Sequence, residues 1–322
     1  MSKNTILVND LTKTFTRNIK RNLIKDIFSP ERQTVYAVNK INFTVDRGES
    51  VAFLGPNGAG KTTTIKMLTG LIHPTSGIVE IMGFTPFDRK KEYLKKIGLV
   101  MGNKAGLNWD LTANQSFELL RYIYDIPKEE FEKRIKFFTE LLDAEKFLNT
   151  QVRKLSLGER MKMELIGAIL HQPDILFLDE PTIGLDIISK QKIRQFLRQI
   201  QRETGVTLLL TSHDMDDIEE VCDRVIVINH GQKIYDDSLQ KLTFKYSKFK
   251  FIKAIFKQMP KDLSMLDYEV IEKDKISVLY KVPRADLSNF ITKVTQNFEL
   301  EDIDISSVPL EEIIADLFRK SN

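Results

Sequence analysis

Nine consecutive residues, GPNGAGKTT at 55–63, have the types and spacing that bind a chain of phosphates. Gly55, Gly60, Lys61 and Thr62 fit the pattern G-x-x-x-x-G-K-[ST]. The glycines let backbone N–H groups converge on an anion, and a following helix adds its positive end. Lys61 is expected to reach the β- and γ-phosphates, and the Thr62 hydroxyl to ligate Mg²⁺. The predicted phosphate contacts are Gly55, Pro56, Asn57, Gly58, Ala59, Gly60, Lys61, Thr62 and Thr63.

Two adjacent acids, Asp179 and Glu180, follow the apolar run 175–178 and form the second candidate. A buried strand that delivers two acids is costly unless something pairs with them. Asp179 is predicted to hold Mg²⁺ through water, and Glu180 to orient and deprotonate an attacking water. A strand simply leaving the core would also explain the pair. Their place after a phosphate loop favours the chemical interpretation.

The elements around these residues alternate between strand and helix. The apolar run 51–54 leads into the loop, and an amphipathic stretch at 63–71 follows it. Further strands are predicted at 97–101, 175–178, 206–210 and 225–228, with helices at 190–203 and 214–222. This alternation predicts an α/β fold with a mostly parallel sheet and right-handed crossovers. Strands are also expected at 5–8 and 35–45, before the phosphate loop, and at 78–82, after its helix. The stretch 9–15 is expected to turn away from the first of these strands.

Two further regions have a different character. Helical spacing at 111–124, 128–142 and 158–170 predicts a helical subdomain at about 104–172. Composition changes after 237, so we expect a nucleotide-binding domain at 1–240 and a small α+β domain at 241–322. The basic stretch 17–32 is expected to be a solvated irregular insertion with a short amphipathic helix at 23–28. The alternative is a surface near nucleotide or lipid head groups.

Composition excludes several classes of protein. The 322 residues carry a net charge of +3, which is no general signature of nucleic-acid binding. A single cysteine, Cys222, excludes an internal disulfide and fits a reducing compartment. No apolar run approaches the roughly 18 residues that span a bilayer, and no signal peptide is visible. We therefore expect a soluble intracellular protein that acts on membranes only through a partner.

Four more motifs follow the phosphate loop along the chain, at Asn103, 155–159, 184–186 and His213. Leu155-Ser156-Leu157-Gly158-Glu159 stands where ATP-binding-cassette (ABC) ATPases carry LSGGQ, and Gly184-Leu185-Asp186 stands where they carry the D-loop. His213 matches the switch histidine, and Asn103 falls at the Q-loop glutamine. Residues 5–240 thus resemble the ATP-binding subunit of ABC transporters. The resemblance implies a P-loop NTPase core with an N-terminal antiparallel β subdomain and an inserted helical subdomain.

That resemblance also implies a mechanism. Two subunits would sandwich two ATP molecules head to tail, each ATP lying on one phosphate loop and under the partner's Ser156, Gly158 and Glu159. Glu180, His213 and Lys61 would be catalytic, with His213 on the γ-phosphate, and Thr62, Asp179 and Asn103 would hold Mg²⁺. Asp186 would line the nucleotide site, and Phe15 would stack on adenine, with Tyr36 as its competitor. Alone, Ser156 and Glu159 would be an ordinary helix cap.

Three residues depart from the family pattern. Leu157 replaces a glycine, and its N–H can still contact phosphate if its φ is negative. Glu159 adds a negative charge where glutamine is usual, and Asn103 is one methylene shorter than glutamine. The altered signature and the C-terminal extension resemble the multidrug and polysaccharide export branch. These changes bear on the turnover rate rather than on ATP binding.

The expected function is therefore an export ATPase. Its expected partners are integral membrane permease subunits and a second ATP-binding subunit, in a homodimer rather than a heterodimer, with no nucleic acid. It would be cytoplasmic and peripheral on the inner face of the cell membrane. An exposed Trp109 would suit a groove that receives a permease helix, whereas a buried Trp109 would be plain core. The alternatives are a soluble ABC ATPase acting on nucleic acid or ribosomes, and a low-turnover regulator. The substrate is not readable, because its contacts would lie in another chain.

Overall fold

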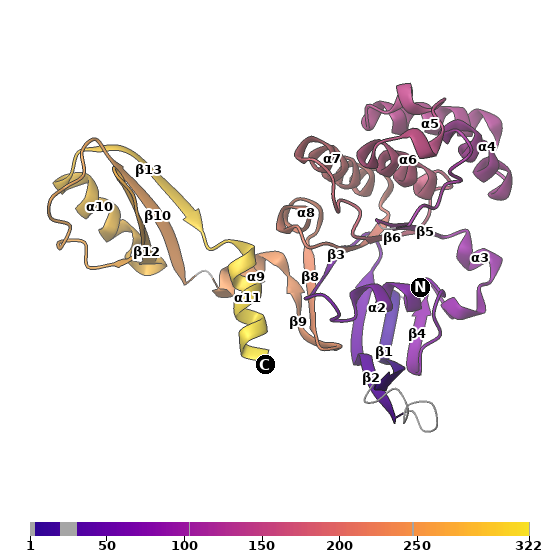
Figure 1. The fold of residues 1–322 in the computed structure, drawn as a ribbon, viewed down its shortest axis with the longest axis horizontal. Coiled ribbons are helices and arrows are strands. Elements are labelled where there is room, and N and C mark those ends of the chain that lie inside the picture. Colours follow the sequence, from indigo (N-terminus) through magenta and orange to yellow (C-terminus); the bar gives the residue numbers. More distant parts are fainter. Residues whose placement is uncertain (1–3, 20–30, 103, 247, 322) are drawn as a thin grey trace. The chain divides into compact units, whose positions relative to one another are not determined.

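The chain forms two compact units, one up to Asp237 and one from Ser238 onward. The computed structural model describes residues 4–19, 31–102, 104–246 and 248–321 (Figure 1). The first unit contains the phosphate loop and both acids, and the second contains the predicted α+β region. Each unit has a hydrophobic core of its own.

A six-stranded sheet forms the centre of the first unit. Its strand order is β5-β6-β7-β3-β8-β9. The pairs β5–β6, β6–β7, β7–β3 and β3–β8 are all parallel, as predicted. All residues of β3, β6 and β7 are buried, which explains their continuous apolar sequences. The bounds are β3 (Ser50–Leu54), β5 (Ile97–Met101), β6 (Ile175–Asp179), β7 (Thr207–Thr211), β8 (Arg224–Asn229) and β9 (Gln232–Ser238). The edge strand β9 was not predicted.

Helices connect these strands. They are α2 (Lys61–Leu68), α3 (Lys91–Leu94), α7 (Ile187–Thr204) and α8 (Met215–Val221), with a short 3₁₀ turn at Pro86–Asp88. The helix α2 begins directly after Gly60, as the phosphate-loop interpretation requires. The helix α7 begins three residues before the predicted start at Lys190. The reason is that Asp186 caps it by accepting the Ser189 N–H at 2.9 Å.

An antiparallel sheet of order β2-β1-β4 packs on the central sheet, with strands β1 (Asn4–Ile19), β2 (Glu31–Asp46) and β4 (Ser76–Ile81). Figure 1 shows this sheet and α2 on one side of the central sheet and the helical region on the other. The expectation that 9–15 turns away was wrong, because register shifts after Val8 and Leu11 let one strand continue. Residues 17–19 and 31–32 are also paired strand rather than irregular insertion. The predicted helix at 23–28 lies outside the described residues.

The helical region contains α4 (Ala113–Ile123), α5 (Lys128–Leu141) and α6 (Leu157–Ile169), close to the predicted ranges. Two 3₁₀ turns, at Glu145–Phe147 and Val152–Lys154, join α5 to α6. Thr112 and Gln115 form a capping box that starts α4. In the described part of the chain, no helix is long and apolar enough to cross a membrane.

The second unit contains an antiparallel sheet of order β11-β12-β10-β13. The helix α10 packs on this sheet, and α9 and α11 pack on each other. Its elements are α9 (Leu239–Tyr246), β10 (Phe249–Phe256), β11 (Glu269–Lys273), β12 (Ser277–Pro283), a 3₁₀ turn (Arg284–Asp286), α10 (Leu287–Asn297), β13 (Leu300–Ser307) and α11 (Leu310–Ser321). Phe256, Tyr280 and Phe290 are the largest fully buried side chains here. The α+β composition agrees with the prediction.

His171, just after α6, carries a half-buried imidazole in the helical region. Its ring stacks on Tyr124 with centroids 3.9 Å apart, and Nε2 lies 3.0 Å from the Ile97 carbonyl oxygen. Nδ1 has no hydrogen-bond partner among the described residues. Burial lowers the pKa of His171 from 6.5 to about 4.

This shift predicts a loss of stability in mild acid. The unfolded chain binds a proton on His171 near pH 6.5, whereas the folded chain resists protonation until about pH 4. Protons therefore favour the unfolded state across that window, by about 1.4 kcal/mol per pH unit. We expect His171→Leu to reduce this pH dependence, measured as the free energy of unfolding in urea at pH 7 and pH 5. Parallel losses in wild type and variant would contradict the assignment.

Candidate functional site

The phosphate loop lies where β3 ends, tightly packed against neighbouring backbone. A Cβ added to Gly55 would lie 2.4 Å from the Ile228 carbonyl oxygen. One added to Gly60, whose φ is +107°, would lie 2.3 Å from the Ala37 carbonyl oxygen. Both positions therefore need glycine. The loop borders a cavity of about 390 Å³, lined by Ala37, residues 57–63, Glu180 and His213.

Lys61 supplies a positive charge to this cavity. Its Nζ donates to the carbonyl oxygens of Gly55 at 2.7 Å and Pro56 at 3.3 Å. Burial lowers the pKa of Lys61, and the charges of Glu180 and Asp179 oppose that shift. The ammonium is thus held directly over the loop, where an anion in the cavity would meet it.

The carboxylate of Asp179 connects the loop to the end of β6. Its Oδ1 accepts from Thr62 Oγ1 at 3.0 Å and from Thr211 Oγ1 at 2.7 Å. Asp179 is only 4% exposed, so both bonds compensate a buried charge. The structure thus brings together Thr62 and Asp179, two predicted ligands 117 residues apart.

The oxygens of Thr62 and Asp179 are the hard donors that Mg²⁺ prefers. The described residues contain no group of three or more His, Cys, Asp or Glu side chains that could hold a metal. A magnesium ion here would therefore complete its shell with phosphate and water oxygens, as Mg²⁺ commonly does. The donor set fits that arrangement. Asn103, the third predicted ligand, lies outside the described residues.

Glu180 is held in an unusual backbone conformation beside the cavity. Its φ is +55°, a strained value for a residue with a side chain. Its N–H donates to the Thr211 carbonyl oxygen at 3.0 Å, and Oε2 accepts the His213 N–H at 3.2 Å. Oε1 lies 3.1 Å from His213 Nε2 but not in line for a hydrogen bond, so it has no hydrogen-bond partner among the described residues. Burial raises the pKa of Glu180, with His213 and Lys61 opposing, which suits a general base.

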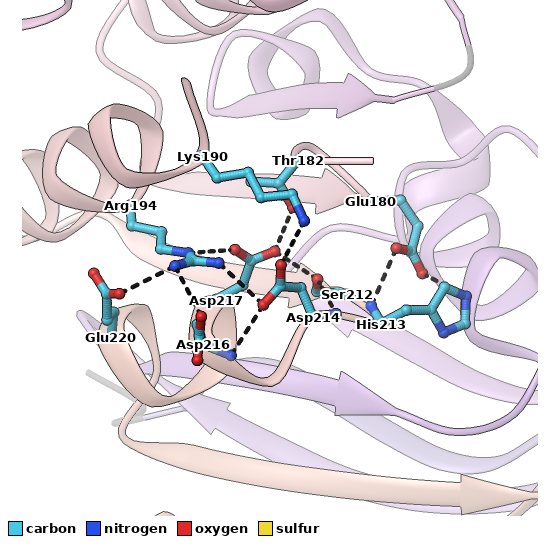
Figure 2. A network of polar contacts seen from close by, with 10 residues as sticks. All are labelled: Glu180, Thr182, Lys190, Arg194, Ser212, His213, Asp214, Asp216, Asp217 and Glu220. Carbon is cyan, nitrogen blue, oxygen red and sulfur yellow. Dashed lines mark hydrogen bonds and ion pairs between the residues drawn. The ribbon is translucent and has the colours of Figure 1, made fainter. Parts of the chain in front are cut away.

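Asp217 on α8 fixes the segments that carry Glu180 and His213 (Figure 2). Its Oδ2 accepts from Ser212 Oγ at 2.6 Å and from the Thr182 hydroxyl. Its Oδ1 accepts from Arg194 Nε on α7 at 2.6 Å. The sequence pattern predicts only a helix at 214–222 and gives no such role to Asp217. The available signal was an acid on the buried face beside Ile218 and Val221.

The signature residues stand at the N-terminus of α6. Ser156 Oγ accepts the Glu159 N–H at 3.4 Å, and a Glu159 carboxylate oxygen accepts the Ser156 N–H at 2.9 Å. The helix-cap interpretation therefore holds within the single chain. Leu157 has a helical backbone, and a Cβ on Gly158 would lie 2.6 Å from Ser189 Oγ. Ser156, Gly158, Glu159 and Asp186 do not line the cavity at the phosphate loop.

The two candidates for the adenine platform are both exposed. Phe15 is 45% exposed and Tyr36 is 55% exposed. Phe15 pairs with Val35 across the strands, whereas Thr14 pairs with Tyr36, so the two rings project from opposite faces. Neither ring lines the cavity.

Removing the Asp217 carboxylate tests the polar network. Arg194 and Asp217 are both buried, so Asp217→Ala leaves a buried guanidinium with weaker partners and two hydroxyls without an acceptor. We expect the free energy of unfolding to fall by about 3 kcal/mol, measured by urea denaturation. As a control, Asp223→Ala breaks an exposed pair with Arg198 and should cost less than about 1 kcal/mol. Equal losses of unfolding free energy in the two variants would mean that the buried network around Asp217 stabilises the fold no more than an exposed ion pair does.

Comparisons with known proteins agree with this geometry. Residues 38–183 match the family model described as ABC transporter. The bacitracin transport ATP-binding protein BcrA of Bacillus licheniformis is 33% identical over 291 residues, covering 88% of this chain and 92% of that protein. The ABC transporter ATP-binding protein NatA of Bacillus subtilis is 35% identical over 215 residues, covering 67% and 87%. The dimeric ATP-binding cassette MJ0796, solved with ADP and Pi, matches with a TM-score of 0.61 and 28% identity, over 73% of this chain and 98% of that one. The chain therefore belongs to the family of ABC transporter ATP-binding proteins, as a subunit that binds and hydrolyses ATP to drive transport.

Proposed function

We propose that this subunit powers export as one of two copies that close on ATP below integral membrane permease subunits. The supporting observation is that the site is divided in the single chain. The phosphate loop, Glu180 and His213 line one cavity, whereas Ser156 and Gly158 lie outside it. A second copy related by two-fold symmetry would place its own signature over that cavity. MJ0796, with which this chain shares its fold, was solved as a dimer.

Export is the direction that the chain's own features favour. The Leu-Ser-Leu-Gly signature and the second unit resemble the export branch of the family. BcrA, whose name assigns it to bacitracin transport, matches 88% of this chain, so the match extends beyond the nucleotide-binding unit. We propose a homodimer on the inner, cytoplasmic face of the membrane, with no nucleic-acid partner.

We assign each site residue a role in binding or hydrolysis. The loop N–H groups and Lys61 bind the β- and γ-phosphates, and Phe15 stacks on the adenine. Glu180 Oε1, buried beside the cavity without a hydrogen-bond partner, accepts a proton from the attacking water. His213 supports the Glu180 carboxylate through its N–H. Thr62, Asp179 and Asn103 hold Mg²⁺, which when bound neutralises charge that develops on the phosphates.

The surface for the permease is proposed around Trp109. Its ring is 52% exposed and lies 5.5 Å from the Arg160 guanidinium, so the interpretation as a buried core residue was wrong. A nearby cavity of about 320 Å³ lies between α4, α6 and β5, with Leu107, Leu120 and Tyr124 in its lining. The helix α4 also carries three exposed apolar side chains, Leu119, Tyr122 and Ile123. An aromatic anchor beside an apolar groove suits a docked helix.

Glu180→Gln tests the hydrolytic assignment. The amide cannot take the proton from water, so kcat should fall by about 10²- to 10⁴-fold while ATP still binds. We expect the variant to accumulate as an ATP-bound dimer, detected by light scattering after gel filtration with MgATP. Glu203→Gln, on the exposed end of α7, is the matched control and should behave like wild type. A Glu180→Gln variant with normal turnover would refute the role, and a wild type without turnover would favour the regulatory alternative.

Trp109→Ala tests the coupling surface. Losing an exposed aromatic anchor should weaken docking by about 2 kcal/mol without touching the nucleotide cavity. In the assembled transporter we expect transport to fall far more than ATP affinity, measured on the same vesicles. Phe137→Ala removes a similarly exposed ring from α5 and should leave transport intact. Equal loss of nucleotide binding in Trp109→Ala would count against the proposal.

A further inference from the structure

Glu164 is a buried acid on α6 with an unusual set of partners. It lies two turns after Ser156 and is 7% exposed. Its carboxylate accepts the Gly106 N–H at 2.9 and 3.0 Å and the Leu107 N–H at 3.2 Å. The acid therefore reaches from the signature helix to the chain segment that follows β5.

The Glu164 carboxylate lies close to the backbone of this segment, beside the cavity between α4, α6 and β5. A Cβ added to Gly106 would lie 2.9 Å from Glu164 Oε2, so the carboxylate approaches the backbone closely. Burial raises the pKa of Glu164, while its backbone hydrogen bonds and the Arg160 charge oppose that shift. The neighbouring residues Met163 and Leu165 are fully buried and apolar. Burying an acid at this position costs desolvation energy that an apolar residue would avoid. The hydrogen bonds to Gly106 and Leu107 offset that cost, so they are the reason for an acid here.

The other end of the same segment touches the catalytic acids. The Gly102 N–H donates to the Asp179 carbonyl oxygen at 2.8 Å. A Cβ added to Gly102 would lie 2.1 Å from the Glu180 carbonyl oxygen. Five positions further along the chain, the Leu107 N–H binds Glu164. A short stretch of backbone thus joins the end of β6 to the body of α6.

We propose that Glu164 is a positioning residue that fixes the segment 104–107 to α6. Through this link, a nucleotide bound beside Asp179 and Glu180 sets the orientation of α6. The N-terminus of α6 carries Ser156, which faces the other copy in the proposed dimer. The segment and helix then move as one piece, held also by the contact of Trp109 with Arg160. This inference rests on the proposed ATP-driven dimerisation. It adds that Glu164 connects the nucleotide site of one copy to the signature residues of the same copy.

The test measures nucleotide binding and dimerisation separately in the full-length chain, on a Glu180→Gln background. Glu164→Ala leaves the Gly106 and Leu107 N–H groups without this acceptor, and the Leu107 N–H is buried. Monomer affinity for a fluorescent ATP analogue should stay within about two-fold, while the dimer dissociation constant with MgATP rises at least about ten-fold. Glu164→Gln keeps one acceptor oxygen and should fall between. Arg134→Ala is the matched control, because it removes a 2.9 Å bond to the Leu170 carbonyl oxygen at the other end of α6.

The outcomes separate this inference from the proposed function and from a general loss of stability. Dimerisation that is unchanged in Glu164→Ala, or weakened equally in Arg134→Ala, would overturn the role of Glu164. If the Glu180→Gln parent itself stays monomeric with MgATP, the proposed dimerisation fails. The link is then judged by hydrogen exchange in the monomer. An MgATP-induced change at 155–160 that disappears in Glu164→Ala supports the link, and one that persists contradicts it.

Discussion

The site depends on one buried carboxylate, that of Asp179, which accepts from Thr62 and Thr211 at once. Two parallel pairings make this possible: β6 with β7, in the register Asp179 with Thr211, and β7 with β3. The carboxyl ends of parallel strands meet at one edge of the sheet, which is where ligands bind in such folds. The phosphate loop, the acids and His213 therefore converge although the chain visits them far apart.

Three buried acids connect the working segments of the first unit. Asp179 joins the phosphate loop to β6 and β7, Asp217 joins α7 to the segments on either side of the cavity, and Glu164 joins α6 to the segment after β5. Each buried charge costs desolvation energy, and each is compensated by several short polar contacts. Apolar side chains would hold these elements together without this desolvation energy. The acids instead fix particular orientations between the elements that they join.

Local patterns predicted much of this architecture, because apolar periodicity and glycine spacing report directly on buried strands and on the loop. The strands β3, β5, β6, β7 and β8, the helix start at Lys61, and the two acids were all visible in this way. The contacts of Glu164 and Asp217 were not, because each depends on partners brought near by tertiary packing. The long strand β1 was cut short in the prediction because its register shifts after Val8 and Leu11 break the simple alternation. The edge strand β9 is only partly buried and lacks a strong pattern.

The central claim is that one ATP is held by the phosphate loop of one copy and the signature of another. Mixing two inactive variants tests it most directly. Lys61→Ala disables the loop and Ser156→Arg disables the signature, so each homodimer lacks any intact site. A mixed dimer contains one intact site, built from the loop of one copy and the signature of the other. The account predicts that mixing restores ATP hydrolysis. With random pairing about half of the dimers are mixed, and each has one intact site of two, so the activity should reach at most about a quarter of the wild-type value. A mixture as inactive as its components would contradict a site shared between two copies.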